Sequence, residues 1–279
     1  MIPASFDYVE AASAEAAIAA LTEHGDEAKL MAGGHSLIPL MRFRLATPSV
    51  VVDISRLSDL SYVRDGGDHL AIGALTRHCE VEASDLVKSQ AGLLAHVAGQ
   101  VGDPQVRHRG TIGGSLAHGD PASDLPAALL ALGGSVVARG PGGERVIAAS
   151  DLFTGFLETA LAPDELLTEV RVPKGPDTTW SFQKFNRRAQ DWAIVGVAAC
   201  RNGAGNGAAG STGVALINMG QTPMLATAVQ SALASGASAA DAAARAAEGT
   251  QPPEDLNGDA EYRTHLAQVL VGRALAELG

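Results

Sequence analysis

The stretch RHRGTIGGSLAHGDPASDLPAALLAL, residues 107–132, carries the pattern that decides this fold. Its paired glycines, Gly113 and Gly114, tolerate positive φ and let backbone N–H groups come close to an anion. Asp124 stands directly before Leu125-Pro126, and an acidic residue followed by an early proline is typical of a helix start. The stretch therefore predicts a glycine loop and then a helix with Asp124 as its N-cap.

A second paired-glycine loop lies nearer the N-terminus, at Ala32-Gly33-Gly34-His35-Ser36. Ser36, Thr111 and Ser115 add hydroxyl donors, so the two loops, if brought together, could clasp the phosphates of a dinucleotide. Neither loop is a GxGxxG or GxxxxGK[ST] motif, so the Rossmann and P-loop classes gain no support. Ordinary turns remain the alternative for each glycine pair taken alone.

Helix and strand patterns alternate around these loops. Ser13 is expected to cap a helix over 14–24 that Gly25 ends, and the β-branched run VVVDI (50–54) predicts a buried strand. Thr76 is expected to cap a helix that runs through Glu82. Further strands are expected over 69–75, over 134–140 and 144–150 as a hairpin, and over 164–173, 180–188, 193–200 and 213–220; further helices over 91–99, from Thr222-Pro223, up to Gly249 and over 259–278.

Composition excludes several classes of protein. The 279 residues carry 20 Lys and Arg against 31 Asp and Glu, a net charge of −11 that argues against nucleic-acid binding. The length favours about two domains. Two cysteines, Cys79 and Cys200, exclude a disulfide framework, an all-cysteine iron–sulfur cluster and a structural zinc site within this chain. With no leader pattern or membrane-length apolar run, the expected location is the cytoplasm.

The motifs in their order resemble a known family. AGGHSLIPLMRFRL (32–45), IGALT (72–76), the pattern TxGGxxxxxDPxxDxP (111–126), KFNRRAQDWAIVGVA (184–198) and YRTHLAQVLVGRAL (262–275) are similar to the FAD-binding subunit of the molybdenum hydroxylases. That family belongs to the xanthine dehydrogenase superfamily. The AGGHS and glycine-loop strings are most similar to the medium chains of aerobic carbon monoxide dehydrogenases.

The resemblance implies an α+β fold. A two-subdomain FAD-binding domain of the vanillyl-alcohol-oxidase (PCMH) type would precede a C-terminal domain with an antiparallel sheet and helices. The expected domains are 1–57 and 58–175 for the two FAD-binding subdomains, and 176–279 for the C-terminal domain. FAD would lie between the N-terminal pair and the C-terminal domain.

The resemblance also implies a set of site residues. Asp124 would accept a hydrogen bond from the ribityl chain, with helix capping as its structural alternative. Leu167 and Lys184 would line the flavin, and Trp192 would lie against the isoalloxazine ring, an arrangement that suits an aromatic face; an ordinary half-buried Trp is the alternative. The FAD pyrophosphate would be held by Ala32, Gly33, Gly34, His35, Ser36, Thr111, Ile112, Gly113, Gly114 and Ser115.

Histidines and arginines cluster around the loops. His35, His108 and His118 form no HxxxH or HExxH pair, so no metal site is expected. They could bond near the pyrophosphate or at a subunit interface, or have no role. Four arginines could offset phosphate charge, pair with a partner's carboxylates, or form a solvated basic surface: Arg42, Arg44, Arg107 and Arg109.

The function implied by the resemblance is electron transfer. No residue of this chain is expected to be catalytic. A large molybdenum subunit would oxidise the substrate, and two [2Fe–2S] clusters of a small subunit would pass electrons to FAD in this chain and on to an external acceptor. The assembly expected is a dimer of heterotrimers. The complex is expected to oxidise carbon monoxide, with an aldehyde, purine or N-heterocycle dehydrogenase as the alternative. A flavin-free scaffolding subunit and a standalone flavin oxidase are the other classes considered.

Overall fold

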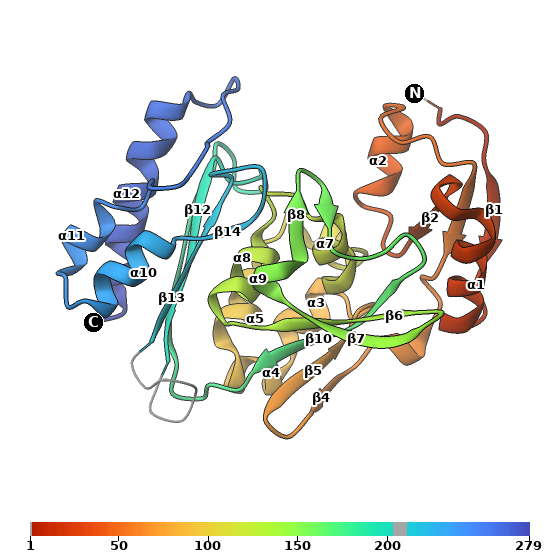
Figure 1. Cartoon of the computed structure of the whole chain (residues 1–279), viewed down its shortest axis with the longest axis horizontal. Coiled ribbons are helices and arrows are strands. Elements are labelled where there is room, and N and C mark those ends of the chain that lie inside the picture. The colour runs from red at the N-terminus through yellow and green to blue at the C-terminus, as the bar shows by residue number, and fades with distance from the viewer. Residues whose placement is uncertain (1, 203–210) are drawn as a thin grey trace.

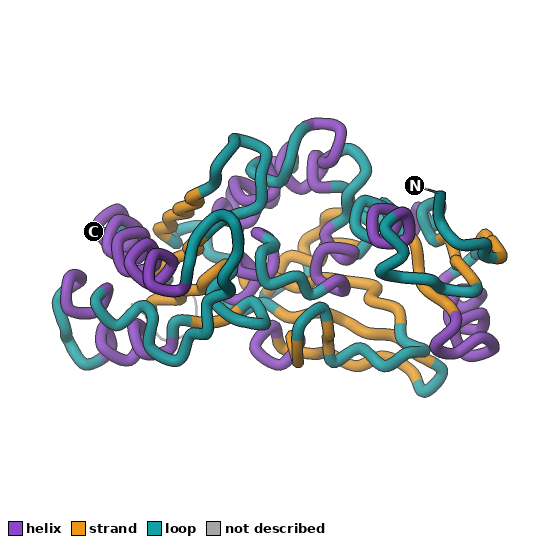
Figure 2. The backbone as a smooth tube through the Cα atoms, turned by 90° about the horizontal axis from the view of Figure 1, so that it is seen from above, coloured by secondary structure: helices purple, strands orange, loops and turns teal. Residues whose placement is uncertain are grey.

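A computed structural model describes residues 2–202 and 211–279. The described chain forms three main sheets that follow one another along the molecule. The N-terminal sheet lies at one end and the C-terminal helices lie at the other, as Figures 1 and 2 show from two directions. This mixture of helices with one parallel and two antiparallel sheets confirms the expected α+β class.

The N-terminal sheet is parallel and has the strand order β1-β3-β2. Ser13 caps α1 by accepting a hydrogen bond from the Ala16 N–H, and Gly25 (φ 53°) ends it, as the sequence predicts. The central strand is buried along its whole length because β-branched side chains suit a covered sheet. The elements are β1 (Asp7–Glu10), α1 (Ala14–His24), η1 (Gly25–Glu27), β2 (Ala28–Met31), α2 (Leu37–Arg42), β3 (Val50–Asp53) and η2 (Ser58–Leu60).

The middle sheet is antiparallel and has the order β4-β5-β10-β6-β7. The predicted hairpin is present, with Gly140 opposite Gly143 across a two-residue loop. Helices α5 and α8 contribute to the largest hydrophobic core. The elements are β4 (Val63–Asp65), β5 (His69–Gly73), α3 (His78–Ala83), α4 (Asp85–Gln90), α5 (Gly92–Gly99), α6 (Pro104–Arg107), α7 (Ile112–His118), α8 (Asp124–Ala131), β6 (Ser135–Gly140), β7 (Gly143–Ala148), α9 (Ala149–Leu152), β8 (Phe153–Gly155), β9 (Glu158–Thr159) and β10 (Leu166–Pro173).

The C-terminal sheet is antiparallel, with the order β11-β12-β13-β14. Its two faces are both covered: α8 packs on one face and α12 on the other. Alternate side chains of β12 accordingly enter two cores, with Ala198 and Cys200 in one and Val197 and Ala199 in the other. The elements are β11 (Thr179–Phe185), β12 (Val195–Arg201), β13 (Thr212–Ile217), β14 (Met224–Leu225), α10 (Thr227–Ala234), α11 (Ala239–Ala243) and α12 (Ala260–Glu277).

Three predicted helix boundaries are wrong. Arg77, not Thr76, is the N-cap of α3, because the Thr76 hydroxyl is bonded to the backbone of Tyr62. The helix expected from Thr222-Pro223 starts at Thr227, since Met224 and Leu225 add a strand to the sheet. The helix expected to end at Gly249 ends at Ala243 and is followed by turns. Among the described residues, no helix is long and apolar enough to cross a membrane.

Candidate functional site

The two glycine loops touch each other. A Cβ on Gly33 would lie 2.1 Å from the backbone oxygen of Arg109 and 3.0 Å from the Cα of Gly110, so only glycine fits there. A Cβ on Gly114 would be 3.9 Å from the Cβ of Ala32. The two loops, far apart in sequence, therefore lie side by side, as the dinucleotide hypothesis required.

The first loop offers free backbone donors. Within the described chain, no hydrogen bond is found for the backbone N–H groups of residues 33–36. Gly34 has φ 74°, a left-handed conformation of the kind that occurs in anion-binding backbone nests. The exposed His35 ring stabilises the turn, since its Nδ1 lies 3.0 Å from the Gly33 carbonyl oxygen. This loop can hold an anion without breaking any existing bond.

The second loop is built differently. Its N–H groups are already used: Ile112 donates to the Thr76 oxygen, Gly113 to Ala74, and both Gly114 and Ser115 to Thr111. Thr111 is the N-cap of α7, and its hydroxyl accepts from Gly114. The expectation that both glycine pairs offer their N–H groups therefore fails for the second loop, because the start of α7 and the segment that follows β5 accept their hydrogen bonds.

Asp124 does not act as a helix cap. Ser123 occupies the N-cap position of α8, and Asp124 is the first helical residue. The Asp124 side chain is buried, with Oδ2 2.7 Å from the Lys184 Nζ. Its Oδ1 is buried and has no hydrogen-bond partner among the described residues. The capping interpretation is wrong, and one carboxylate oxygen is left to accept a bond from a ligand.

The Asp124–Lys184 pair joins helix α8 to the C-terminal sheet. Lys184 lies on β11 and also donates to the Gln100 carbonyl oxygen at 3.2 Å, so its ammonium group is fixed between α8 and the end of α5. Burial raises the pKa of Asp124 to about 6, while the nearby Lys184 charge opposes that rise. The carboxyl group therefore changes charge close to neutral pH.

A short bond connects this pair to the second loop. The hydroxyls of Ser115 and Ser123 are 2.9 Å apart, which places Asp124 directly beside residues 111–115. Leu167 is buried in β10 next to Thr168, whose oxygen accepts from Ala74 behind the second loop. The predicted residues of the loops and Asp124, Lys184 and Leu167 are thus brought together.

Trp192 lies at the edge of this region. It is 59% exposed, in the loop between β11 and β12. The next residue, Ala193, accepts a bond from the Asn218 side chain, and the Asn218 N–H donates to the Pro121 oxygen. Trp192 is therefore near the segment before α8 but is not packed into the sheet, so the half-buried alternative is wrong.

The charged groups around the loops have mixed roles. Arg107 pairs with Glu82 at 3.1 Å, and Arg77 donates to the Arg109 backbone oxygen under the first loop. His108 is exposed and bonds within its own turn, and burial lowers the pKa of His118. No cluster of His, Cys, Asp and Glu suited to a metal is present in the described chain.

His78 is a site neighbour that the sequence does not reveal. It is 4% exposed, and a Cβ on Gly110 would lie 2.6 Å from its Nε2. Its Nδ1 has no hydrogen-bond partner among the described residues. Burial lowers its pKa to about 4, so it is neutral at physiological pH. A single histidine after a strand forms no sequence pattern that would identify it as a site residue. Only its packing under the junction of the two loops identifies it.

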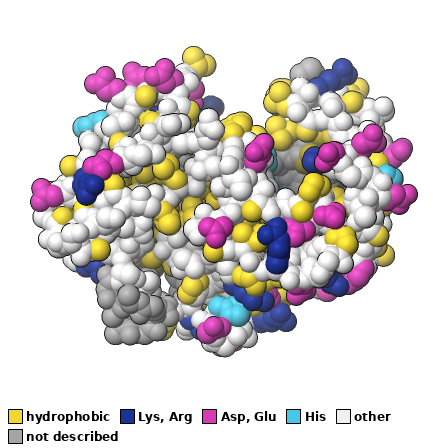
Figure 3. Space-filling view, in the orientation of Figure 1, with side chains coloured by type: hydrophobic (Ala, Val, Ile, Leu, Met, Phe, Trp, Pro, Cys, Tyr) yellow, Lys and Arg dark blue, Asp and Glu magenta, His cyan; other side chains and the backbone are white. Residues whose placement is uncertain are grey.

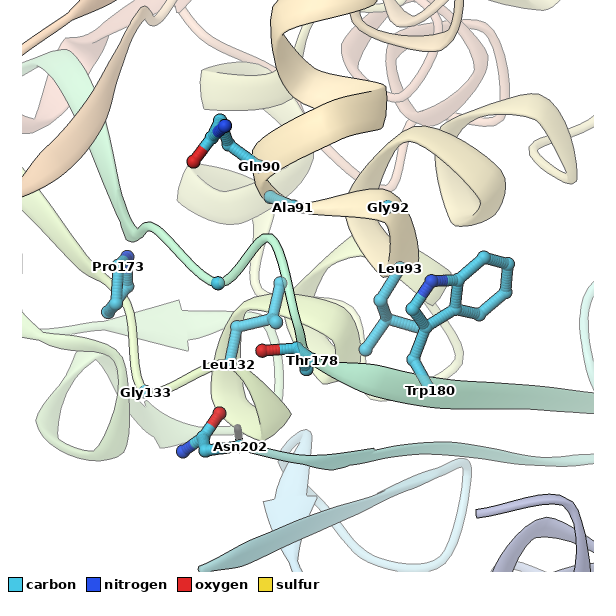
Figure 4. A pocket seen from close by; sticks show the side chains of 11 residues that line it. Gln90, Ala91, Gly92, Leu93, Leu132, Gly133, Pro173, Thr178, Trp180 and Asn202 are labelled. Atoms are coloured by element: carbon cyan, nitrogen blue, oxygen red, sulfur yellow. The ribbon is translucent and has the colours of Figure 1, made fainter. Parts of the chain in front are cut away.

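A separate cavity of about 270 Å³ lies between the start of α5 and the start of β11. Figure 4 shows Gln90, Thr178, Trp180 and Asn202 around it. None of the described residues that line it has an ionisable side chain. It contains none of the predicted site residues.

Comparison with known proteins gives a consistent result. Residues 4–175 match the family described as the FAD binding domain in molybdopterin dehydrogenase, and residues 180–278 match the CO dehydrogenase flavoprotein C-terminal domain. The chain is 39% identical to the carbon monoxide dehydrogenase medium chain of Hydrogenophaga pseudoflava, over 99% of this chain and 97% of that one.

Two further relatives extend this result. The chain is 38% identical to subunit alpha of the 6-hydroxypseudooxynicotine dehydrogenase complex of Paenarthrobacter nicotinovorans, over 99% of this chain and 95% of that one. A solved structure of carbon monoxide dehydrogenase from Hydrogenophaga pseudoflava superposes with a TM-score of 0.95 at 39% identity, covering 100% of this chain and 98% of that chain.

Proposed function

Because this chain belongs to the family of FAD-binding medium subunits of molybdenum hydroxylases, we propose that it carries electrons from a partner's [2Fe–2S] clusters to an external acceptor. The cofactor site we propose comprises the two glycine loops and the Asp124–Lys184 pair. Bound FAD supplies the chemistry, taking up two electrons and giving them up again. The protein residues bind and orient it.

The fit of these residues to FAD supports the proposal. The free N–H groups of residues 33–36 suit a diphosphate, which needs several donors close together. The orphaned Oδ1 of Asp124 suits a hydroxyl donor such as those of a ribityl chain, because a buried acceptor without a partner is costly. This orphaned oxygen beside the joined loops is the observation that carries the proposal.

The other predicted residues have supporting roles in this proposal. Lys184 keeps Asp124 oriented and favours its ionised form. Thr111, Ile112, Gly113, Gly114 and Ser115 shape the wall opposite the first loop. Leu167 contributes apolar surface behind it, and the exposed face of Trp192 is free to cover a planar ring.

We propose the assembly as follows. A small iron–sulfur subunit and a large molybdenum subunit are the partners, in a dimer of heterotrimers in the cytoplasm; the two free cysteines are in keeping with that compartment. Sedimentation and cell fractionation test both points. The domains are 1–57, 58–175 and 176–279, which limited proteolysis tests.

The proposed substrate of the whole complex is carbon monoxide, by analogy with the relative of that name. A relative with a different printed substrate is almost equally similar, so oxidation of an aldehyde, a purine or another N-heterocycle is the second candidate. Purified native complex assayed with carbon monoxide, an aldehyde and a heterocycle decides between them. Activity on the last two alone would overturn the carbon monoxide assignment.

The first test of the cofactor proposal is a visible spectrum of the purified chain, alone and co-expressed with the partner subunits. A flavin spectrum that releases about one FAD per chain supports the proposal. Flavin only after co-expression keeps the function and shows that assembly completes the site. Absence of flavin in both preparations would leave a scaffolding subunit whose glycine loops are turns.

A further inference from the structure

The segment after the first glycine loop carries an exposed apolar surface. Ile38, Phe43 and Leu45 are 44%, 65% and 76% exposed, and Arg42 and Arg44 are exposed among them. We call these five residues the α2 patch. Figure 3 shows hydrophobic and basic side chains together at the top of the right-hand lobe, over α2. Exposed apolar side chains that gather in this way mark interaction sites.

The charge of the α2 patch differs from that of the whole chain. No Asp or Glu occurs in the sequence between Ala28 and Val52, although the chain carries 31 acidic against 20 basic residues. A shallow groove of about 430 Å³ borders the patch at Leu45, Ala46 and Pro48, and its other wall carries Asp26, Glu27 and Lys29. The α2 patch is therefore basic and apolar, whereas the protein as a whole is acidic.

The backbone at the end of α2, within the α2 patch, adopts an unfavourable conformation. The end of α2 is a left-handed cap: the Arg44 N–H bonds to the Met41 oxygen and the Leu45 N–H to the Leu40 oxygen. Arg44 has φ 59° at the position where glycine is normally found. Leu45 also stays exposed, although the equivalent residue of such caps often packs back on its helix. The fold alone therefore does not account for an arginine at this positive φ or for the exposure of Leu45.

We propose that the α2 patch is a docking surface for another subunit of the complex, one that presents an apolar surface flanked by carboxylates. This inference rests on the proposed function. A second copy of this chain fits poorly, because a two-fold interface would place Arg42 and Arg44 near their own copies. An anionic membrane fits poorly too, since two arginines and a few side chains provide little anchorage and the rest of the protein is acidic.

The test uses the full chain titrated with its purified partner subunits. Phe43→Ser/Leu45→Ser and Arg42→Glu/Arg44→Glu are each expected to weaken binding at least about tenfold, since aromatic and arginine side chains dominate interfaces. Leu256→Ser and Arg273→Glu, exposed positions near the C-terminal end, are matched controls expected to leave binding unchanged. FAD content per chain should equal that of the parent in all four variants.

Arg44→Gly separates docking from folding. Glycine suits φ 59°, so the thermal midpoint should be equal or higher while binding to the partner falls. A lower midpoint would show that Arg44 serves the fold and would count against docking.

Several outcomes overturn the inference. Unchanged partner binding in both double variants does so directly. So does a result in which partner binding is kept and only self-association, or only binding to phosphatidylcholine–phosphatidylserine vesicles, is lost. Loss of FAD from the double variants would make the patch part of the cofactor site. A parent chain without FAD would instead refute the proposed function, which keeps the two failures distinct.

Discussion

At the scale of single residues, Gly33 is the position where the smallest change has the largest expected effect. Gly33→Ala forces a Cβ to within 2.1 Å of the Arg109 oxygen, which is backbone and cannot rotate away. We expect the free energy of unfolding to fall by about 1–3 kcal/mol and FAD affinity to fall by about tenfold or more. Isothermal titration and urea unfolding measure both.

The control for this change is Gly142→Ala. Gly142 lies in the hairpin loop with no atom within 4 Å of the added methyl group and no positive φ. It should bind FAD as the parent does. Equal FAD binding by the Gly33 variant would refute the account of the loop junction.

The charge of Asp124 predicts two opposite pH dependences. The ionised carboxylate accepts the stronger hydrogen bond, so FAD affinity should decrease about fivefold as the pH falls through about 6. The folded pKa of about 6 is above the ordinary value of 3.8. The contribution of Asp124 to the free energy of unfolding of the flavin-free chain is therefore full below about pH 4 and is lost as the pH rises through 6.

Asp124→Asn isolates these contributions. Fluorescence titration with FAD between pH 5 and 8, and urea unfolding between pH 4 and 7, should show both slopes reduced in the variant relative to the parent. His78, with a pKa of about 4, does not titrate in the upper range. Identical slopes in parent and variant would remove Asp124 from the site.

At the scale of elements, the Asp124–Lys184 pair fastens α8 to β11. Lys184→Met leaves a buried carboxylate without its partner and should lower the free energy of unfolding by about 3 kcal/mol at pH 7.5. The loss should be smaller at pH 5, where protonation neutralises Asp124. Asp124→Leu/Lys184→Met should restore the stability, because apolar side chains can replace a buried ion pair without loss.

FAD binding separates the two possible roles of this pair. The double variant should be stable yet bind FAD weakly, whereas a purely structural pair would give a stable variant that binds normally. Arg245→Met is the control, since the exposed Arg245–Glu248 pair should contribute less than about 1 kcal/mol.

At the scale of the whole molecule, the proposed site combines the loop after the N-terminal sheet with Leu167 of the middle sheet and Lys184 of the C-terminal sheet. A saturating ligand therefore stabilises the entire fold. FAD at 1,000 times its dissociation constant should raise the free energy of unfolding by about 4 kcal/mol, seen as a shift of several degrees in circular dichroism melting. FMN, which lacks the diphosphate, should shift the midpoint much less. Equal shifts with both would contradict the role given to residues 33–36.

Local sequence patterns predicted many of the helices, strands and turns of this molecule. Ser13 and Gly25 bound α1, VVVDI is a buried strand, and the hairpin around Pro141-Gly142 is in place. Each depends on interactions between near neighbours: a capping hydroxyl, a β-branched run or a two-residue turn. The glycine loops were recognised for the same reason, since glycine pairs followed by serine form a local pattern.

Whether a polar group bonds within the protein or stays free for a ligand depends on contacts between distant residues. Only the tertiary structure decided this for the site residues. Asp124 has the local pattern of a helix cap, but Lys184, 60 positions away, holds its carboxylate instead. The second loop loses its N–H donors to Thr76 and Ala74, while the first keeps its own. The sequence by itself determined which chemical groups the protein has. Packing decided which of them stay free, because a buried donor or acceptor bonds to whatever the fold brings beside it.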